Sequence, residues 1–208
     1  MAGGKASPRQ KMINLMYLVF LAMIALNMGK QVLDAFGLVN AKFESANTRA
    51  NGTIAATFAD LETKASENPK QYAAILEQSK QIKSLSSDLY SYIQEIKTGL
   101  EDAIGQKDKK VEDYTDHLFF AEGATKGTEF VEKINAYREG ILKILGENKA
   151  YAELATKVKE NFSTNDRKDK DGNTVKWLHF NFEGFPYIAS LAKFSMMQSD
   201  ILSVQQDF

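Results

Sequence analysis

Residues 12–28 form the most apolar stretch of the chain, and no other feature limits its possible folds as strongly. The stretch reads MINLMYLVFLAMIALNM, 17 residues without a formally charged side chain. A membrane-spanning helix needs about 20 mostly apolar residues, and basic side chains at its ends, here Lys11 and Lys30, extend toward the lipid head groups. The sequence therefore predicts a transmembrane helix over residues 12–33.

A cleaved signal peptide and a buried helix of a soluble protein are the alternatives for this stretch. A signal peptide also has a basic start and an apolar core, but its core is usually about 7–15 residues long and ends in small residues at the cleavage site. Residues 25–27 read Ala-Leu-Asn, which is a poor cleavage site. We favour an uncleaved membrane anchor over both alternatives.

The segment before the predicted span is basic and contains no acid. Residues 1–11 contain Lys5, Arg9 and Lys11 and no acidic residue. Basic residues beside a membrane span are retained in the cytoplasm. We therefore expect a cytoplasmic N-terminus over residues 1–11, with Lys5 and Lys11 setting the topology, and an exported region over residues 34–208.

The start of the predicted helix places a cation where the helix dipole disfavours one. Ser7 and Pro8 are typical of an N-cap and a first helical position, so Arg9 falls in the first turn. Arg9 is either a further topology signal or the partner of a carboxylate on a neighbouring subunit. No Asp or Glu precedes Asp34. If protons move along this helix, another chain must supply the carboxylate that carries them.

Two sets of residues in the span are suited to contacts between proteins. Asn14 and Tyr17 fall on one helix face, and polar groups facing lipid are costly, so we expect this face to meet another protein. Ala22, Ala25 and Gly29 form a stripe of small residues, which allows two membrane helices to approach closely.

The rest of the chain has helical periodicity, and we predict an all-α fold in which the membrane helix continues into a helical bundle. Asp171-Gly172 is a hairpin-type turn, so a small two-stranded hairpin is expected near residues 163–180, its second strand running from Val175 toward His179. The last helix has no stop signal before Phe208, and we expect the natural protein to continue. The predicted helices are a continuation of the span to about residue 64, then 68–104, 130–145, 149–162 and 186–208, with a connector over 106–126 that tucks in Leu118–Phe120.

Composition and spacing argue against several functions. The chain has no cysteine, which excludes disulfides, thiolate metal sites and thiol nucleophiles. Its 26 basic and 27 acidic side chains argue against binding to nucleic acid. His117 and His179 lie in different segments, and residues 167–178 lack the ligands of a calcium loop. We therefore expect no metal site, no cofactor and no enzymatic activity.

Residues 1–44, and in support residues 181–201, resemble the GldM/PorM family. Members of this family are the single-span subunits of the bacterial motor for gliding motility and type IX secretion. The resemblance implies an inner-membrane protein with a periplasmic helical domain, in which a dimer of this subunit threads through a pentameric ring of a multi-span GldL/PorL-type partner. The complex would convert the proton-motive force into motion, transmitted to outer-membrane secretion components through domains beyond residue 208.

The same resemblance assigns roles to individual residues. Arg9 matches the family's arginine in PRQKMINLMYLVF, which is proposed to pair with a glutamate of the partner, and Tyr17 matches the tyrosine of that motif. The absence of an acid in this helix fits a proton-binding carboxylate on the partner. A single-pass ligand sensor or periplasmic tether is the alternative function. A sensor is less favoured because only about eleven residues precede the span.

Overall fold

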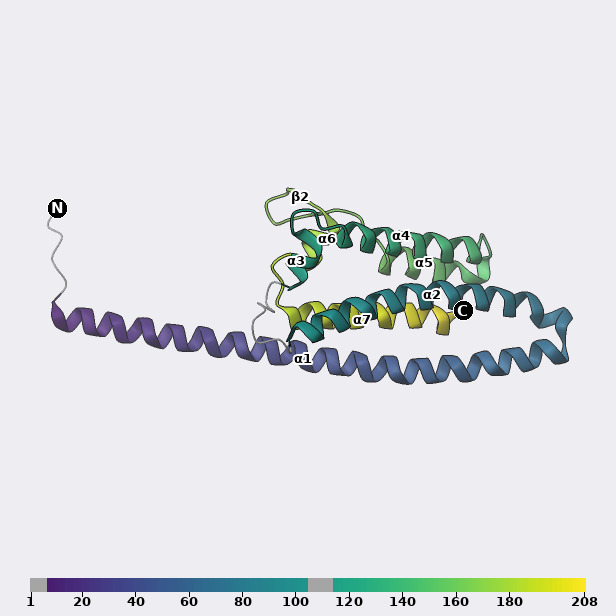
Figure 1. Cartoon of the computed structure of the whole chain (residues 1–208), viewed down its shortest axis with the longest axis horizontal. Helices are drawn as coiled ribbons and strands as arrows, with labels where there is room; N and C mark the ends of the chain where they lie inside the picture. The colour runs from purple at the N-terminus through teal and green to yellow at the C-terminus, as the bar shows by residue number, and fades with distance from the viewer. Residues whose placement is uncertain (1–6, 105–113) are drawn as a thin grey trace.

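A computed structural model describes residues 7–104 and 114–208, except for the side chains of residues 24–28 and 104. Helices dominate it, which confirms the predicted all-α fold (Figure 1). The elements in chain order are α1 (Pro8–Glu67), α2 (Pro69–Ile104), α3 (Tyr114–Phe120), α4 (Lys126–Leu145), the 3-10 turn η2 (Lys149–Tyr151), α5 (Ala152–Asn161), β1 (Arg167–Lys168), β2 (Thr174–Val175), α6 (Trp177–Phe182) and α7 (Tyr187–Asp207).

Helix α1 is a single 60-residue rod, about 90 Å long at 1.5 Å per residue. Its start is as predicted: Ser7 is the N-cap, with its hydroxyl accepting a hydrogen bond from the Gln10 amide at 3.3 Å, and Pro8 follows. Asn68 and Pro69 end it, three residues later than expected from periodicity. Its first half projects beyond the rest of the molecule, and its second half packs against the bundle (Figure 1).

Within the part of the chain that the structure describes, no helix combines the length and the apolar character that crossing a membrane requires. The predicted span over residues 12–33 includes residues 24–28, whose side chains lie outside that part.

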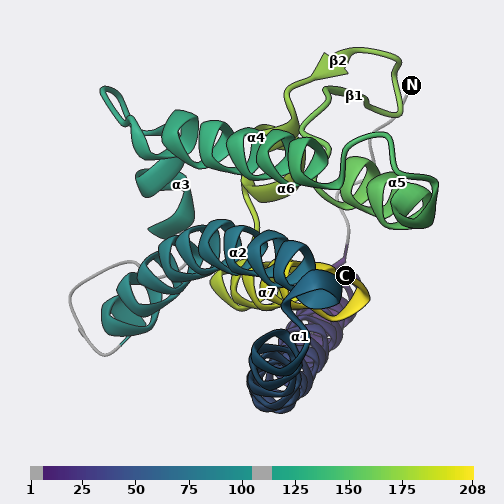
Figure 2. The same cartoon turned by 90° about the vertical axis from the view of Figure 1, so that its right-hand side faces the viewer.

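The bundle is arranged in three tiers, seen end-on in Figure 2. The second half of α1 forms the first tier, α2 and α7 form the second, and α3, α4, α5 and α6 form the third. Helix α1 runs parallel to α7 and antiparallel to α2 (Figure 1). An aromatic cluster joins the second and third tiers, because one of its four rings belongs to α7 and the other three belong to α3, α4 and α6. Its members are Phe119, Phe130, Phe182 and Phe194, all at most 5% exposed.

The region after α5 differs in part from the prediction. A small antiparallel hairpin is present, pairing Arg167 with Val175 and Lys168 with Thr174 around Gly172, whose φ of +84° is the left-handed conformation that glycine adopts at such turns. Its second strand ends at Val175, so the predicted extension toward His179 is wrong. Residues 177–182 form α6 instead, which buries Phe182 in the aromatic cluster; an alternating pattern this short does not distinguish a strand from a helix.

The connector between α2 and α4 also contains a helix that the sequence pattern does not predict. Residues 105–113 lie outside the described residues, but Leu118–Phe120 forms the end of α3. Phe119 is buried and stacks on Phe130 at 5.5 Å between ring centroids, which confirms that this apolar triplet is tucked into the core.

Asp200 is expected to make the stability of the bundle depend on pH. It lies half-buried on α7, where burial raises the pKa of its carboxyl from 3.8 to about 6. A raised carboxyl pKa means that the folded state binds a proton more readily than the unfolded state. The contribution of Asp200 to the stability of the protein therefore increases as the pH falls from about 7 to about 4. We expect Asp200→Asn to remove this dependence and to stabilise the protein at pH 7.5 by about 1–2 kcal/mol, after allowance for solvent screening.

The measurement is urea unfolding of the whole chain at pH 4 to 8, followed by the fluorescence of Trp177, the one tryptophan of the sequence. The Asn161 amide donates to Asp200 at 3.4 Å, a contact that asparagine preserves through its side-chain oxygen. Asp88→Asn, at an exposed site on α2, is the matched control. Equal pH dependence in wild type and Asp200→Asn would contradict the assignment.

Candidate functional site

The predicted coupling residues lie on the projecting half of α1. Arg9, Asn14 and Tyr17 are all exposed. The Gln10 side-chain amide donates to the Asn14 side-chain oxygen at 3.3 Å, so these two residues share a helix face. The first turn of α1 contains no acidic residue. Arg9 therefore has no counter-ion within this turn. The role of Arg9 as a contact for a partner stays a prediction.

The residues predicted to pack helices or to set topology lie in the same region. Lys11, Ala22 and Gly29 are exposed, whereas Lys5 and the Ala25 side chain lie outside the described residues. A Cβ atom added to Gly29 would meet nothing within 4 Å, so the space beside it is open. The role of this stripe in helix packing stays a prediction.

Apolar side chains cover the projecting half of α1 on every side. From residue 12 to residue 23, its large apolar side chains and Tyr17 are between 47% and 69% exposed. A helix that is apolar all round is normally buried in a protein core or a membrane. The described part of this chain does not supply that cover.

A second candidate site, which we name the polar junction, lies where α1, α2 and α7 meet. Its centre is Lys97 of α2, whose side chain is 1% exposed. The Lys97 ammonium forms an ion pair with the Glu44 carboxylate of α1 and donates a hydrogen bond to Gln198 Oε1 of α7 at 2.9 Å. One buried cation thus connects all three helices.

Further polar side chains extend the junction on α1 and α7. The Ser195 hydroxyl lies 2.6 Å from the Glu44 carboxylate and 2.7 Å from the Asn40 side-chain oxygen. The Asn47 amide donates to the Ser195 carbonyl oxygen at 2.9 Å, although the two residues are 148 positions apart in the sequence. On the α2 side, the Gln198 amide lies 3.1 Å from Gln94 Oε1 and 3.3 Å from the Tyr90 carbonyl oxygen. We define the polar junction as Asn40, Glu44, Asn47, Gln94, Lys97, Ser195 and Gln198.

The charges within the junction compensate each other. Burial alone would raise the pKa of Glu44, but the hydrogen bonds from Lys97 and Ser195 and the positive charge of Lys97 outweigh it and hold this pKa below its usual 4.5. Removing a charged group from water is costly unless it is paired and hydrogen-bonded. The Lys97 ammonium meets this condition, because it is paired with the Glu44 carboxylate and hydrogen-bonded to the Gln198 amide oxygen.

The junction was not predicted from the sequence, although the pattern contains a signal for it. Lys97 stands between Ile93 and Leu100 on the buried face of α2, a position where periodicity expects an apolar residue. Asn40, Glu44 and Asn47 recur at i, i+4 and i+7 on α1, which marks a polar face. A charged residue in a core position of one helix and a polar stripe on another together indicate a buried ion pair.

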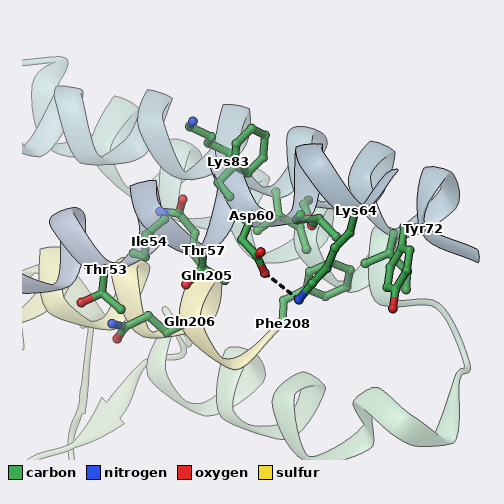
Figure 3. Close-up of a pocket in the computed structure, with 15 residues that line it drawn as sticks. Thr53, Ile54, Thr57, Asp60, Lys64, Tyr72, Lys83, Gln205, Gln206 and Phe208 are labelled. Carbon is green, nitrogen blue, oxygen red and sulfur yellow. Dashed lines mark ion pairs between the residues drawn. The ribbon is translucent and has the colours of Figure 1, made fainter. Parts of the chain in front are cut away.

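The C-terminal part of α1 and the N-terminal part of α2 line a cavity of about 350 Å³ beside the end of α7 (Figure 3). Its walls combine apolar residues such as Ile54 and Phe208 with the Asp60–Lys64 ion pair at 2.6 Å. No group of three or more potential metal-binding side chains occurs among the described residues. Within that same part of the chain, neither the cavity nor its surroundings contains an arrangement of side chains typical of catalysis.

These features define a class of protein: an all-α bundle fixed to one long helix whose other half is apolar and uncovered. Residues 31–208 match the family model of the GldM N-terminal domain, and the chain therefore belongs to the GldM family. Membership associates it with the machinery of gliding motility and type IX secretion, in which the family is a structural and motor component and not a known enzyme. No curated protein is significantly similar to the chain. Arg9, Asn14 and Tyr17 precede the matched residues.

Proposed function

We propose that this chain is the membrane-anchored subunit of a proton-driven motor, and that α1 carries motion from the inner membrane into the periplasmic bundle. The observation that carries the proposal is the continuity of α1, which has no break between its uncovered apolar half and the half that packs in the bundle. A continuous helix transmits tilt and rotation along its axis without a flexible joint. An anchor that served only as a tether has no need of this stiffness.

The dimensions of α1 support its placement in a membrane. Residues 12–33 rise about 33 Å along the helix axis, which is close to the roughly 30 Å of a bilayer hydrocarbon core. The hydrogen bonds between α1 and α7 begin close behind this segment, with Asn40. The bundle then lies directly at the outer surface of the membrane, with residues 1–11 in the cytoplasm.

The chemistry of the span supports a partner that carries the proton. No acidic residue precedes Asp34, so this chain has no carboxyl group in the segment that would load and release protons there. In the proposed complex, a multi-span GldL/PorL-type partner provides that carboxyl group, and Arg9 pairs with its ionised form. Asn14 and Tyr17 face the partner. Ala22, Ala25 and Gly29 lie between the two helices of a dimer enclosed by a pentameric ring.

No bound cofactor is required by this scheme, because the proton gradient acts through the partner. The periplasmic bundle then passes motion to outer-membrane secretion components through domains that follow residue 208. These partner and stoichiometry assignments rest on the family resemblance of residues 1–44, and the geometry of α1 is compatible with them.

The absence of cysteine permits a direct test of topology with single introduced cysteines. We expect a membrane-impermeant maleimide to label Glu62→Cys, which is exposed on the bundle half of α1, but not Gly4→Cys in intact spheroplasts. After lysis both should react. Labelling of both in intact spheroplasts, or loss of the N-terminal residues from the mature chain, would contradict the anchor. Purification from native membranes should recover a stoichiometric multi-span partner, and recovery of this chain alone would favour a tether.

A further inference from the structure

We propose that the polar junction fixes the register of α1 against α2 and α7 and is the point at which displacement of α1 enters the bundle. The first half of this statement concerns the fold alone, and the second half rests on the proposed function. The ion pair between Glu44 and Lys97 is its central element.

The contact between α1 and the bundle changes character along its length. Near the projecting half it is polar, with Asn40, Glu44 and Asn47 facing α7 and α2. Farther along it becomes apolar, and this part lines the cavity or is buried. The residues of the apolar part are Ile54, Phe58, Leu61 and Ala65.

The apolar part does not by itself define one register. Its residues recur at every turn of the helix, so a displacement of α1 by one turn, about 5.4 Å, again places apolar side chains against apolar side chains. Dispersion and burial are not directional, so the apolar contact itself opposes a displacement of α1 only weakly. The displacement also requires the turn at Asn68, which joins α1 directly to α2, to shift by one helical turn. The preference for one register of α1 must come from another part of the interface.

The polar part supplies that specificity because Glu44 has no substitute. It is the one acidic residue of α1 between Asp34 and Asp60. Displacement by one turn in either direction would bring Asn40 or Thr48 to the position of Glu44, and neither carries a negative charge. Lys97, 1% exposed and held on its other side by Gln198, would then lose its counter-ion in a buried position. An uncompensated buried charge is strongly unfavourable, so the displaced registers are suppressed.

The junction is also placed where displacement first arrives. Among the described residues, Asn40 makes the first polar contact that α1 forms with α7, immediately after the uncovered half of the helix. A pull, tilt or rotation of that half therefore acts on the junction before it acts on the apolar contacts. A register-specific contact at this point converts motion of α1 into motion of the whole bundle and prevents α1 from slipping along it.

The test replaces the ion pair with apolar residues of similar size, in the variant Glu44→Leu/Lys97→Met. Such replacements often preserve or increase stability, so the bundle should stay folded by Trp177 fluorescence. Spin labels at Glu62→Cys on α1 and Glu160→Cys on α5, both exposed, then report the register of the whole chain in nanodiscs. We expect one narrow distance distribution in the parent. In the variant we expect a second population, whose distance differs by no more than the one-turn displacement of about 5 Å.

The exposed pair of Asp60 and Lys64, on the same helix, offers a matched control. Lys64→Met should keep the single narrow distribution. If the double variant does not fold, Glu44→Gln, which keeps the shape of the side chain and removes its charge, is measured by the same criterion. An unchanged distribution in the folded variant would overturn the register assignment.

Secretion or gliding assays separate the two halves of the proposal. Loss of activity together with the displaced population supports both halves. A displaced population with full activity would overturn the role in transmission while leaving the register assignment in place. The distance measurement requires no motor activity, so failure of the proposed function, detected through Arg9, is distinguishable from failure of the junction.

Discussion

Replacing Arg9 with alanine is expected to reduce secretion or gliding that depends on this chain to background levels while leaving the bundle folded. Arg9 is exposed in the first turn of α1, a turn that contains no acidic residue. A cation at a helix N-terminus opposes the helix dipole, so its removal costs the isolated helix nothing. In the proposed mechanism the loss reflects a missing contact with a partner carboxylate, and secretion assays in a strain carrying only the variant measure it.

Two further variants define what kind of contact Arg9 makes. Arg9→Lys keeps the charge but not the two-pronged geometry with which a guanidinium binds a carboxylate, so we expect partial activity. Lys11→Ala removes a neighbouring charge that we assign to topology alone, and it should retain most activity. The membrane level and the Trp177 fluorescence of each variant must equal those of the parent. Full activity of Arg9→Ala would remove the central claim of the proposed mechanism.

Most helices of this fold are predictable because local signals mark their ends. Asn68 and Pro69 separate α1 from α2, and Gly146, with its φ of +58°, ends α4 where periodicity and glycine both predict an end. Within α4, the buried side chains of Phe130 and Ile141 belong to one apolar stripe. Signals of this kind involve residues within a few positions of each other, which a sequence contains completely.

The elements that were missed depend on contacts between distant segments. Helix α6 is only six residues long, too short for a reliable periodic pattern, and burial of Phe182 against Phe130 and Phe194 holds it in place. The polar junction is a stronger case. Lys97 on α2 is a normal helical residue by itself, and only the arrival of Glu44 and Gln198 from other helices makes its burial possible.

Glu44→Ala is expected to destabilise the bundle by about 3 kcal/mol, the largest effect on stability of any substitution considered, because it leaves a buried ammonium without its counter-ion. The Lys97 side chain is 1% exposed, and among the described residues only the neutral Gln198 oxygen remains as its partner. The estimate lies at the lower end for buried pairs because Glu44 itself is 43% exposed, which lets water enter the vacated space. Urea unfolding at pH 7.5, followed by Trp177 fluorescence, measures the change in the free energy of unfolding.

The pair of Glu44 and Lys97 also predicts how stability changes in acid and how a second substitution restores it. Since the pKa of Glu44 is lowered on folding, its contribution to stability is complete above its ordinary value of 4.5 and is lost as the pH falls through the lower folded value. The difference between wild type and Glu44→Ala should therefore shrink in acid, opposite in direction to the effect of Asp200. Adding Lys97→Met to Glu44→Ala should recover most of the lost stability, because the second change removes the charge that the first leaves unpaired. If Glu44→Ala alone were as stable as wild type, the Lys97 ammonium would have to be hydrated by water. A hydrated ammonium needs no counter-ion, so it would be equally stable in every register of α1. The ion pair could then not favour one register over the others.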